Sequence, residues 1–259
     1  MNSVFRGKLA GTISRAVGAT PIGYFPVRVR AGRAKGARWT LLPFSAYWRY
    51  GETENDLPRA ASYLPTLDGI TFWDIGAHFG IHTVGMAIAV GSKGQVAAFE
   101  PDPAAFSRLS YHVNKNHLSN VRLFDAAASR TNGRGDLFLP GGLATSCSHF
   151  KYYPDNDMTG TASLSVSMVA LDDLVQSGSI RAPNLIKIDV QGHGAEALAG
   201  AANSIKSSLP VIAFSNHSDA ERDGTKAILA PMGYSPRSLD GSDYAWADIA
   251  DTAVLIPNK

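Results

Sequence analysis

The sequence predicts an α/β fold in which a doubly wound, mostly parallel sheet carries an N-terminal β-hairpin extension. From residue 70 onwards, short apolar runs alternate with segments of helical periodicity, which is typical of parallel strands joined by crossover helices. Residues 25–42 instead alternate apolar and basic side chains on either side of a glycine-containing turn, as β-hairpins do. A chain of 259 residues is long enough for one domain with such an extension.

Five parallel strands are predicted, at residues 70–75, 95–99, 121–124, 185–190 and 211–214. The helix after the first strand is indicated by Ile81, Val84 and Ile88, whose spacing defines one buried stripe. Asp102 and Pro103 are typical of a helix N-terminus, so the second helix is expected to begin there. One helix after the fourth strand is predicted to carry Ala195, Leu198, Ala202 and Ile205. Two further segments complete the sheet, at residues 232–239 and 245–256.

The chain is expected to divide into an extension, residues 1–66, and a main domain, residues 67–259. The extension combines a basic tail, the hairpin and a helix near residues 57–64. Residues 131–163 interrupt the main domain with glycines, prolines and aromatic side chains. Because long irregular insertions are uncommon unless they cover a site or move, this segment is expected to cover a functional site.

Charge is unevenly distributed along the chain. Residues 1–50 hold nine Lys or Arg and no acidic residue, whereas the whole chain holds 24 basic and 22 acidic residues. The rest therefore carries 15 basic and 22 acidic residues, a net charge of −7. A basic arm of this kind is either a solvated extension or a binding segment for phosphate, anionic lipid or an acidic glycan.

Cysteine and apolar content restrict the class of protein further. The single cysteine, Cys147, excludes an internal disulfide and a thiolate metal cluster. No apolar run approaches the ~18 to 20 residues that span a bilayer, and no secretory signal begins the chain, so a cytoplasmic location is expected. His78 and His82 have the spacing of two helical metal ligands, but no third ligand lies nearby in sequence, and no metal site is predicted.

The most informative segment joins the first strand to the first helix and contains Asp74, Gly76, Ala77 and Gly80. Open α/β sheets bind ligands at such carboxyl ends of parallel strands. Gly76 permits a tight turn with positive φ, and Gly80 permits close approach of the helix to a ligand. The N–H groups at the helix start are available to polar ligand atoms. A nucleoside site is therefore predicted at this edge of the sheet.

Glu100 ends the second strand, where a carboxylate can accept hydrogen bonds from both ribose hydroxyls of an adenosine. Pro101 follows it and is assigned to the same site. Asp125, at the end of the third strand, is either an adenine contact or a plain strand-terminal acid. A nicotinamide dinucleotide is the rival ligand, but the glycines follow G-x-x-x-G rather than the G-x-G-x-x-G that suits a pyrophosphate.

Four motifs, in order along the chain, carry a family resemblance: WDIGAHFG at 73–80, AFEPDP at 98–103, LDDL at 171–174 and IKIDVQGH at 186–193. On these motifs the chain resembles the FkbM-type methyltransferase family from about residue 25 to residue 239. The resemblance implies a Rossmann-like methyltransferase fold, S-adenosylmethionine as donor, and O-methylation of a hydroxyl on a small molecule or glycan. It also implies donor-binding roles for Asp74, Gly76, Gly80 and Glu100, and it matches Asp189 to the family's aspartate after strand four.

The chain departs from the family pattern at two positions on the acceptor side. Family members usually carry a glutamate where this chain has Gly194, and often one where it has Ser215. Three alternatives therefore stay open: an O-methyltransferase, a protein that binds S-adenosylmethionine with weak or no catalysis, and a nucleotide-binding oxidoreductase.

Methyl transfer to a hydroxyl benefits from a base within about 3 Å that takes the proton. Asp189, His193 and His217 are the ionisable residues expected near the ends of strands four and five. His217 is predicted to be the base, with His193 as the second candidate. Asp189 is predicted to position donor or acceptor, because a charge in an apolar strand is costly to bury without a role.

The predicted partner is a small-molecule or glycan acceptor, and no specific nucleic acid or transmembrane segment is expected. The chain lacks the Asn/Asp-Pro-Pro-Tyr motif used on extruded bases, and a basic arm alone gives only salt-sensitive binding. The sequence leaves the oligomeric state open. One set of aromatic residues either stacks on the acceptor or packs the extension onto the domain: Trp39, Tyr47, Trp48, Tyr50, Tyr152 and Tyr153.

Overall fold

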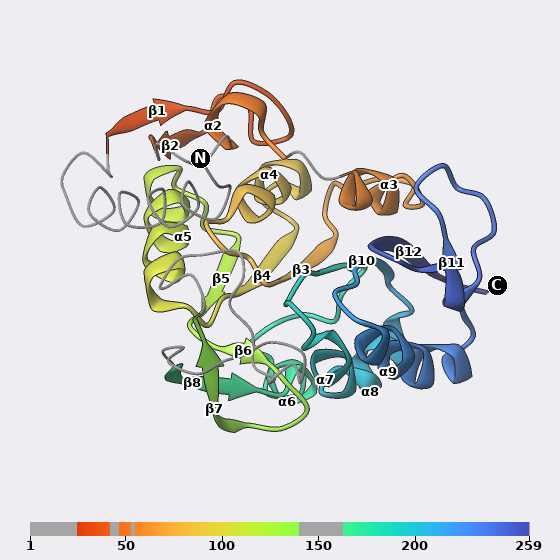
Figure 1. The fold of residues 1–259 in the computed structure, drawn as a ribbon. Helices are drawn as coiled ribbons and strands as arrows, with labels where there is room; N and C mark the ends of the chain where they lie inside the picture. The colour runs from red at the N-terminus through yellow and green to blue at the C-terminus, as the bar shows by residue number, and fades with distance from the viewer. Residues whose placement is uncertain (1–24, 42–46, 53–54, 140–162, 259) are drawn as a thin grey trace, which may run out of the picture.

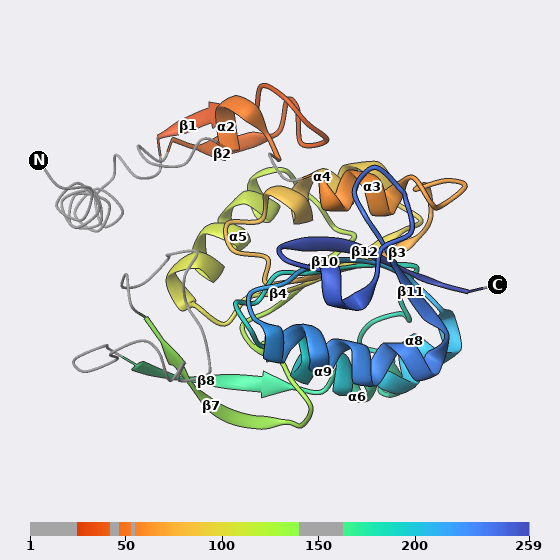
Figure 2. The ribbon, with the colours of Figure 1, turned by 45° about the vertical axis from the view of Figure 1, so that its right-hand side comes forward.

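The computed structural model describes residues 25–41, 47–52, 55–139 and 163–258. These residues form a seven-stranded sheet with the order β11-β12-β10-β9-β3-β4-β5, a three-stranded sheet with the order β6-β8-β7, and the hairpin β1-β2. Helices cover both faces of the large sheet, which gives the body of the molecule three layers (Figure 1, Figure 2). The predicted doubly wound, mostly parallel sheet with an N-terminal hairpin is confirmed.

Five neighbouring strands of the large sheet run parallel: β3 (Thr71–Ile75), β4 (Gln95–Phe99), β5 (Val121–Phe124), β9 (Leu185–Ile188) and β10 (Val211–Ser215). β12 (Thr252–Pro257) lies antiparallel between β10 and β11 (Tyr234–Arg237). Every residue of β3, β9 and β10 is buried, because these strands are covered on both faces. The strand order reverses between β3 and β9, and parallel sheets bind ligands at such a reversal.

Two sets of helices cover the sheet (Figure 2). One face carries α3 (Asp56–Ala61), α4 (Ile81–Val90) and α5 (Pro103–Lys115). The other carries α6 (Leu171–Gln176), α7 (Gly194–Ala199), α8 (Ala202–Ser208) and α9 (Asp219–Leu229). Because side chains alternate along a strand, Phe72 packs against the helices of the first face and its neighbour Trp73 against those of the second.

Two helix predictions need correction. Ile88 is 47% exposed, so the buried face of α4 contains Ile81 and Val84 but not Ile88. The single helix predicted after the fourth strand is two helices, α7 and α8. Gly200, which ends α7, lies so close to the preceding part of the chain that a Cβ there would stand 1.9 Å from the backbone oxygen of Ser129.

The sequence suggested that residues 131–163 are irregular throughout, but the structure has strands at both ends of this segment. β7 (Gly133–Phe138) pairs antiparallel with β8 (Ser163–Val169), which also pairs with β6 (Ala127–Ala128). Residues 140–162, with Cys147 and two of the aromatic candidates, lie outside the described residues. A cover formed by this segment therefore stays a prediction.

The N-terminal hairpin packs against the helical layer above the large sheet (Figure 1). It consists of β1 (Pro26–Arg28) and β2 (Arg38–Thr40), and α2 (Tyr47–Tyr50) follows it. Trp39 of β2 is 1% exposed and stacks on His112 of α5 with ring centroids 3.5 Å apart, so this aromatic residue packs the extension onto the domain.

A domain boundary between residues 66 and 67 stays a prediction. The tail that carries the first three basic residues of the arm lies outside the described part of the chain. Within residues 25–41, 47–52, 55–139 and 163–258, no helix has both the length and the apolar character needed to cross a membrane.

Candidate functional site

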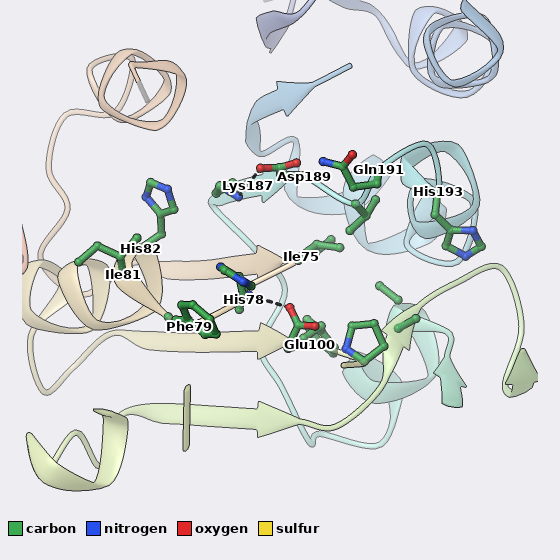
Figure 3. A pocket seen from close by; sticks show the side chains of 18 of the residues that line it. Ile75, His78, Phe79, Ile81, His82, Glu100, Lys187, Asp189, Gln191 and His193 are labelled. Carbon is green, nitrogen blue, oxygen red and sulfur yellow. Dashed lines mark hydrogen bonds and ion pairs between the residues drawn. The ribbon is translucent and has the colours of Figure 1, made fainter. Parts of the chain in front are cut away.

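A pocket lies at the carboxyl ends of β3, β4 and β9, beside the point where the strand order reverses (Figure 3). The turn between β3 and α4, the end of β4 and the segment after β9 form its walls, and Tyr47 of α2 contributes a side chain. Its polar lining comes from seven residues: His78, His82, Glu100, Lys187, Asp189, Gln191 and His193. The glycine turn and the acid that the sequence assigns to a nucleoside therefore line one pocket.

Gly76 begins the turn after β3 with a φ of +83°. A Cβ at this position would stand 2.0 Å from the backbone oxygen of Asp189, so the turn lies directly against the segment after β9. On its other side, the N–H groups of Gly76 and Ala77 donate to the carbonyl of Phe99 at 3.1 and 3.0 Å. Only glycine combines this φ with this contact, in agreement with the predicted tight turn.

Gly80, at the other end of the turn, also has a positive φ, +86°. A Cβ here would meet Cδ1 of Leu109 in α5 at 2.4 Å. The backbone conformation and the packing of α4 on α5 both require this glycine. Gly80 also lines the pocket, and its close approach to a ligand stays a prediction. His78, between the two glycines, is left-handed as well with a φ of +50°, which is unusual for a side chain of its size.

Glu100 lies at the floor of the pocket and is 7% exposed. Its Oε2 accepts the backbone N–H of His78 at 2.7 Å (Figure 3), and its Oε1 accepts that of Asp102 at 2.9 Å. Burial raises the pKa of the carboxyl to about 7, because its effect outweighs the opposite effect of the two backbone hydrogen bonds. Each oxygen keeps a second acceptor position, which a bidentate grip on two hydroxyls requires.

The other predicted donor-site acids lie outside the pocket lining. Asp74 is fully buried behind the turn, where its Oδ2 accepts a hydrogen bond from Thr83 Oγ1 at 2.6 Å. Its Oδ1 has no hydrogen-bond partner within the described ranges. Asp125 is exposed at the end of β5, whereas Pro101, next to Glu100, lines the pocket.

Opposite Glu100, three ionisable side chains form a chain of contacts at the ends of β9 and β10. Lys187 is 2% exposed, and its Nζ lies 3.5 Å from Oδ2 of Asp189 (Figure 3). His217, from the loop after β10, places its Nε2 at 2.8 Å from Oδ1 of the same carboxylate. Asp189, directly after β9, thus joins a lysine of β9 to a histidine of the loop after β10.

These contacts shift the proton affinities of the histidine and the carboxylate in opposite directions. Burial alone would raise the pKa of Asp189, but Lys187 and His217 outweigh it and hold that pKa well below its usual range. Burial alone would lower the pKa of His217, but Asp189, assisted by Glu221, raises it above its usual 6.5. Asp189 is therefore an anion and a weak base, and His217 is the stronger base of the two.

The two predicted catalytic histidines occupy different positions. His193 lines the pocket at 8% exposure, with its Nε2 at 3.1 Å from Ser129 Oγ. His217 lies beside Asp189, a lining residue, and is not itself among the residues that line the pocket. Because Asp189 holds Nε2 of His217, the Nδ1 atom is the one left to take a proton.

A carboxylate from another helix lies beside each of the two positions where this chain departs from the family. Glu221 of α9 places Oε1 at 2.8 Å from the N–H of Gly194, and a Cβ on Gly194 would stand 2.7 Å from that oxygen. Asp56 of α3 is 1% exposed, and its Oδ2 lies 3.4 Å from Oγ of Ser215. Buried acids therefore lie beside both positions.

Several lining residues were not among the predicted site residues. Lys187 could have been found, because it precedes Asp189 by two positions and so shares its side of the strand. Gln191 lines the same wall with a φ of +50°. Tyr47, by contrast, comes from a separate helix, and only its aromatic character marked it as a candidate. Among the described residues, no group of three or more His, Cys, Asp or Glu is arranged to hold a metal ion.

Comparison with known proteins assigns this arrangement to a family. The model of the methyltransferase FkbM domain matches residues 74–236, which is more than half of the chain. The hexuronic acid methyltransferase AglP of Haloferax volcanii is 29% identical over 195 residues, or 74% of this chain and 75% of the relative. The 2-O-methyltransferase NoeI of Sinorhizobium fredii is 29% identical over 141 residues, or 50% of this chain and 56% of the relative.

A solved structure supports the fold. The crystal structure of the methyltransferase FkbM from Methylobacillus flagellatus superposes with a TM-score of 0.50 at 21% identity, and covers 76% of this chain and 47% of that chain. The chain thus spans about half the length of that protein and of NoeI. The family match covers the glycine turn, Glu100 and the Lys187–Asp189–His217 chain alike, and this protein therefore belongs to the FkbM family of S-adenosylmethionine-dependent methyltransferases.

Proposed function

We propose that the protein transfers a methyl group from S-adenosylmethionine to a hydroxyl oxygen of a glycan or other polyhydroxylated small molecule. The observation that carries the proposal is the contact between Gly76 and the backbone of Asp189, which joins the nucleoside side of the pocket to its ionisable side. The names of two relatives, a hexuronic acid methyltransferase and a 2-O-methyltransferase, support a sugar as the acceptor.

The residues of the turn and of β4 suit the donor. Glu100 offers one spare acceptor position on each carboxylate oxygen, which matches the two ribose hydroxyls. Gly76, where any Cβ would collide with the backbone of Asp189, lets the turn lie directly against the segment after β9, and the buried Oδ1 of Asp74 behind the turn lacks a partner among the described residues. When bound, S-adenosylmethionine supplies an electrophilic methyl group on a positively charged sulfur.

The acceptor side supplies alignment and a base. In the proposed reaction an acceptor O–CH₃ bond forms as the S–CH₃ bond breaks, and the hydroxyl proton passes to Nδ1 of His217. Asp189 orients the imidazole through Nε2 and stabilises the imidazolium that results. Alignment of the acceptor oxygen with the methyl group contributes the remainder of the rate. His193, which lines the pocket, is the second candidate for the base.

Neither alternative function is favoured by the comparisons. Both curated relatives are named as methyltransferases, which speaks against an oxidoreductase. The buried acids Glu221 and Asp56 beside Gly194 and Ser215 speak against a donor-binding protein whose acceptor side has lost its acids.

Two measurements on the same preparation test this function. Calorimetry with S-adenosylmethionine should show binding at one site per chain. Incubation with the donor and a panel of neutral and acidic oligosaccharides should release S-adenosylhomocysteine in an acceptor-dependent manner. Donor binding without turnover on any glycan or polyol would support a binding protein, and absence of donor binding would overturn the proposal.

A further inference from the structure

Glu221 is a buried acid to which the proposed reaction assigns no part. It lies in the first turn of α9, is 2% exposed, and is not among the residues that line the pocket. Helix α9 packs beside α7 under the sheet (Figure 1), so Glu221 faces the segments that follow β9 and β10. A carboxylate is costly to bury, and its position therefore calls for a physical reason.

Helix capping explains only part of the arrangement. Ser218 is the N-cap of α9, and its Oγ accepts the N–H of Glu221 at 3.1 Å, as in the first half of a capping box. In such a box the glutamate returns to the N–H of the cap residue itself. Here Oε2 instead accepts the N–H of His217 at 2.8 Å, one residue before the cap.

The second oxygen of Glu221 crosses to a different segment. Oε1 accepts the N–H of Gly194, the first residue of α7, at 2.8 Å. A Cβ at position 194 would stand 2.7 Å from Oε1 and 3.2 Å from Cγ2 of Ile188, so the absence of a side chain admits the carboxylate. Glu221 therefore ties the segment that carries His193 to the loop that carries His217.

The charged and polar groups around His217 come from three places. Asp189 and Lys187 approach from the end of β9, Gln191 from the loop after it, and Glu221 from α9. His217 thus lies between two carboxylates, one on its side chain and one on its backbone. The charge of Glu221 adds to that of Asp189 in favouring the protonated imidazole.

We propose that Glu221 is a positioning residue, which holds the backbone of His217 so that the imidazole meets Asp189 and faces the acceptor with Nδ1. The proposal rests on the proposed function, in which His217 takes the acceptor proton. Both carboxylate oxygens of Glu221 must accept hydrogen bonds to hold the two segments together, since the groups they face are the backbone N–H donors of Gly194 and His217. An amide at this position satisfies one donor and sets its own NH₂ against the other.

The test compares Glu221→Gln with Glu196→Gln. Glu196 lies on the neighbouring helix α7 and pairs with Arg130, so it is the control for the same chemical change. Glu221→Gln should lower kcat roughly 10- to 100-fold while the dissociation constant of S-adenosylmethionine changes less than about twofold. The pKa of His217, followed by NMR of labelled histidine, should fall, and the acid limb of kcat should move to lower pH with it. Glu196→Gln should leave all of these unchanged.

A variant that retains its charge separates positioning from simple stabilisation. Glu221→Asp keeps the carboxylate but shortens its reach, so it should preserve more of the raised histidine pKa than Glu221→Gln and still lose turnover. A lower melting temperature with unchanged kcat and unchanged His217 pKa in Glu221→Gln would overturn the proposal and leave a helix cap. The NMR titration needs no turnover. It can therefore show that Glu221 does not position His217 even if the proposed reaction is correct, and the two failures are distinguishable.

Discussion

The backbone N–H of His78 donates to Oε2 of Glu100 at 2.7 Å, so the left-handed residue of the turn holds the acid that is proposed to bind the ribose. Because burial raises the pKa of Glu100 to about 7, the carboxyl is partly protonated near neutral pH. In the proposed donor site the ionised form accepts from both ribose hydroxyls, and protonation of the carboxyl removes acceptor capacity. Donor affinity should therefore rise with pH up to about 7 and fall by up to about tenfold per pH unit below it.

Replacement of the acid tests the same contact. Glu100→Gln should weaken S-adenosylmethionine by about 1.5–3 kcal/mol at pH 8 and abolish the pH dependence, as followed by calorimetry. Asp248→Asn, which changes an exposed carboxylate, is the matched control and should retain it. If Glu100→Gln binds the donor as well as the parent does, the ribose is held elsewhere.

The N-terminal hairpin is joined to the donor turn through His112. Its Nε2 lies 2.8 Å from Thr40 Oγ1, and its Nδ1 lies 2.8 Å from the carbonyl of Phe79. The ring is therefore a neutral tautomer that donates from Nδ1 and accepts at Nε2. Thr40→Val leaves Nε2 unpaired and should reduce the free energy of unfolding by about 1–3 kcal/mol in urea titrations. Hydrogen exchange at residues 76–80 should accelerate, whereas a turn with unchanged protection would show that the hairpin does not support it.

The same histidine predicts an acid-sensitive fold. Burial lowers the pKa of His112 to about 3, against about 6.5 in an unfolded chain. Between these values the unfolded state binds a proton that the folded state excludes, so stability present above pH 6.5 is lost as pH falls. The slope is at most about 1.4 kcal/mol per pH unit from this group, and urea midpoints of His112→Phe and the parent should converge as pH falls from 6.5 to 5. Parallel pH dependence in the two proteins would assign the effect to other groups.

Substitutions at position 194 test whether the family glutamate is simply missing or whether Glu221 occupies its place. On sequence alone, Gly194→Glu is expected to raise activity if the family glutamate is simply missing. The structure reverses this expectation, because Oε1 of Glu221 stands 2.7 Å from where a Cβ would be. Gly194→Ala should cost about 1–3 kcal/mol of stability in the parent and much less in a Glu221→Ala background. Equal costs in the two backgrounds would show that the residues do not compete for this space.

The pH profile tests His217 as the base. Asp189, with Glu221, raises the pKa of His217, so the acid limb of kcat should lie above 6.5, the value that an unperturbed histidine would give. Below that limb, kcat should fall about tenfold per pH unit, since the base must be unprotonated. His217→Ala should cost roughly 10²–10⁴ in kcat with donor affinity nearly unchanged. A flat profile down to pH 5 would point to alignment with proton loss to water.

The parallel core of the fold could be predicted because its signals are local. Runs such as 95–99 and 121–124 coincide with β4 and β5, and Asp102 caps α5 as its position before Pro103 indicated. The break between α7 and α8 could not be predicted in this way. At this break Gly200 lies against the backbone of Ser129, 71 positions earlier, and helical periodicity does not record such a contact.

The residues of the candidate site likewise divide into those with a local sequence signal and those without one. Gly76 and Glu100 were recognisable because turn and strand end each carry their own residue signal. Glu221 and Asp56 were not, since each comes from a helix distant in sequence: Glu221 occupies the space beside Gly194, and Asp56 lies next to the hydroxyl of Ser215. Sequence position alone therefore indicated missing acids where the folded chain supplies them.

The position of the transferred methyl group tests the central claim most directly. A panel of neutral and uronic-acid oligosaccharides would be incubated with the enzyme and deuterium-labelled S-adenosylmethionine, and the products mapped by tandem mass spectrometry before and after mild base. A hydroxyl acceptor needs a base and yields a methyl ether, whereas a carboxylate acceptor needs none and yields an ester. We expect a base-stable label on a hydroxyl oxygen, formed at least about 100-fold more slowly by His217→Ala. A base-labile label formed equally fast by that variant, or no label on any acceptor although the donor binds, would contradict the account.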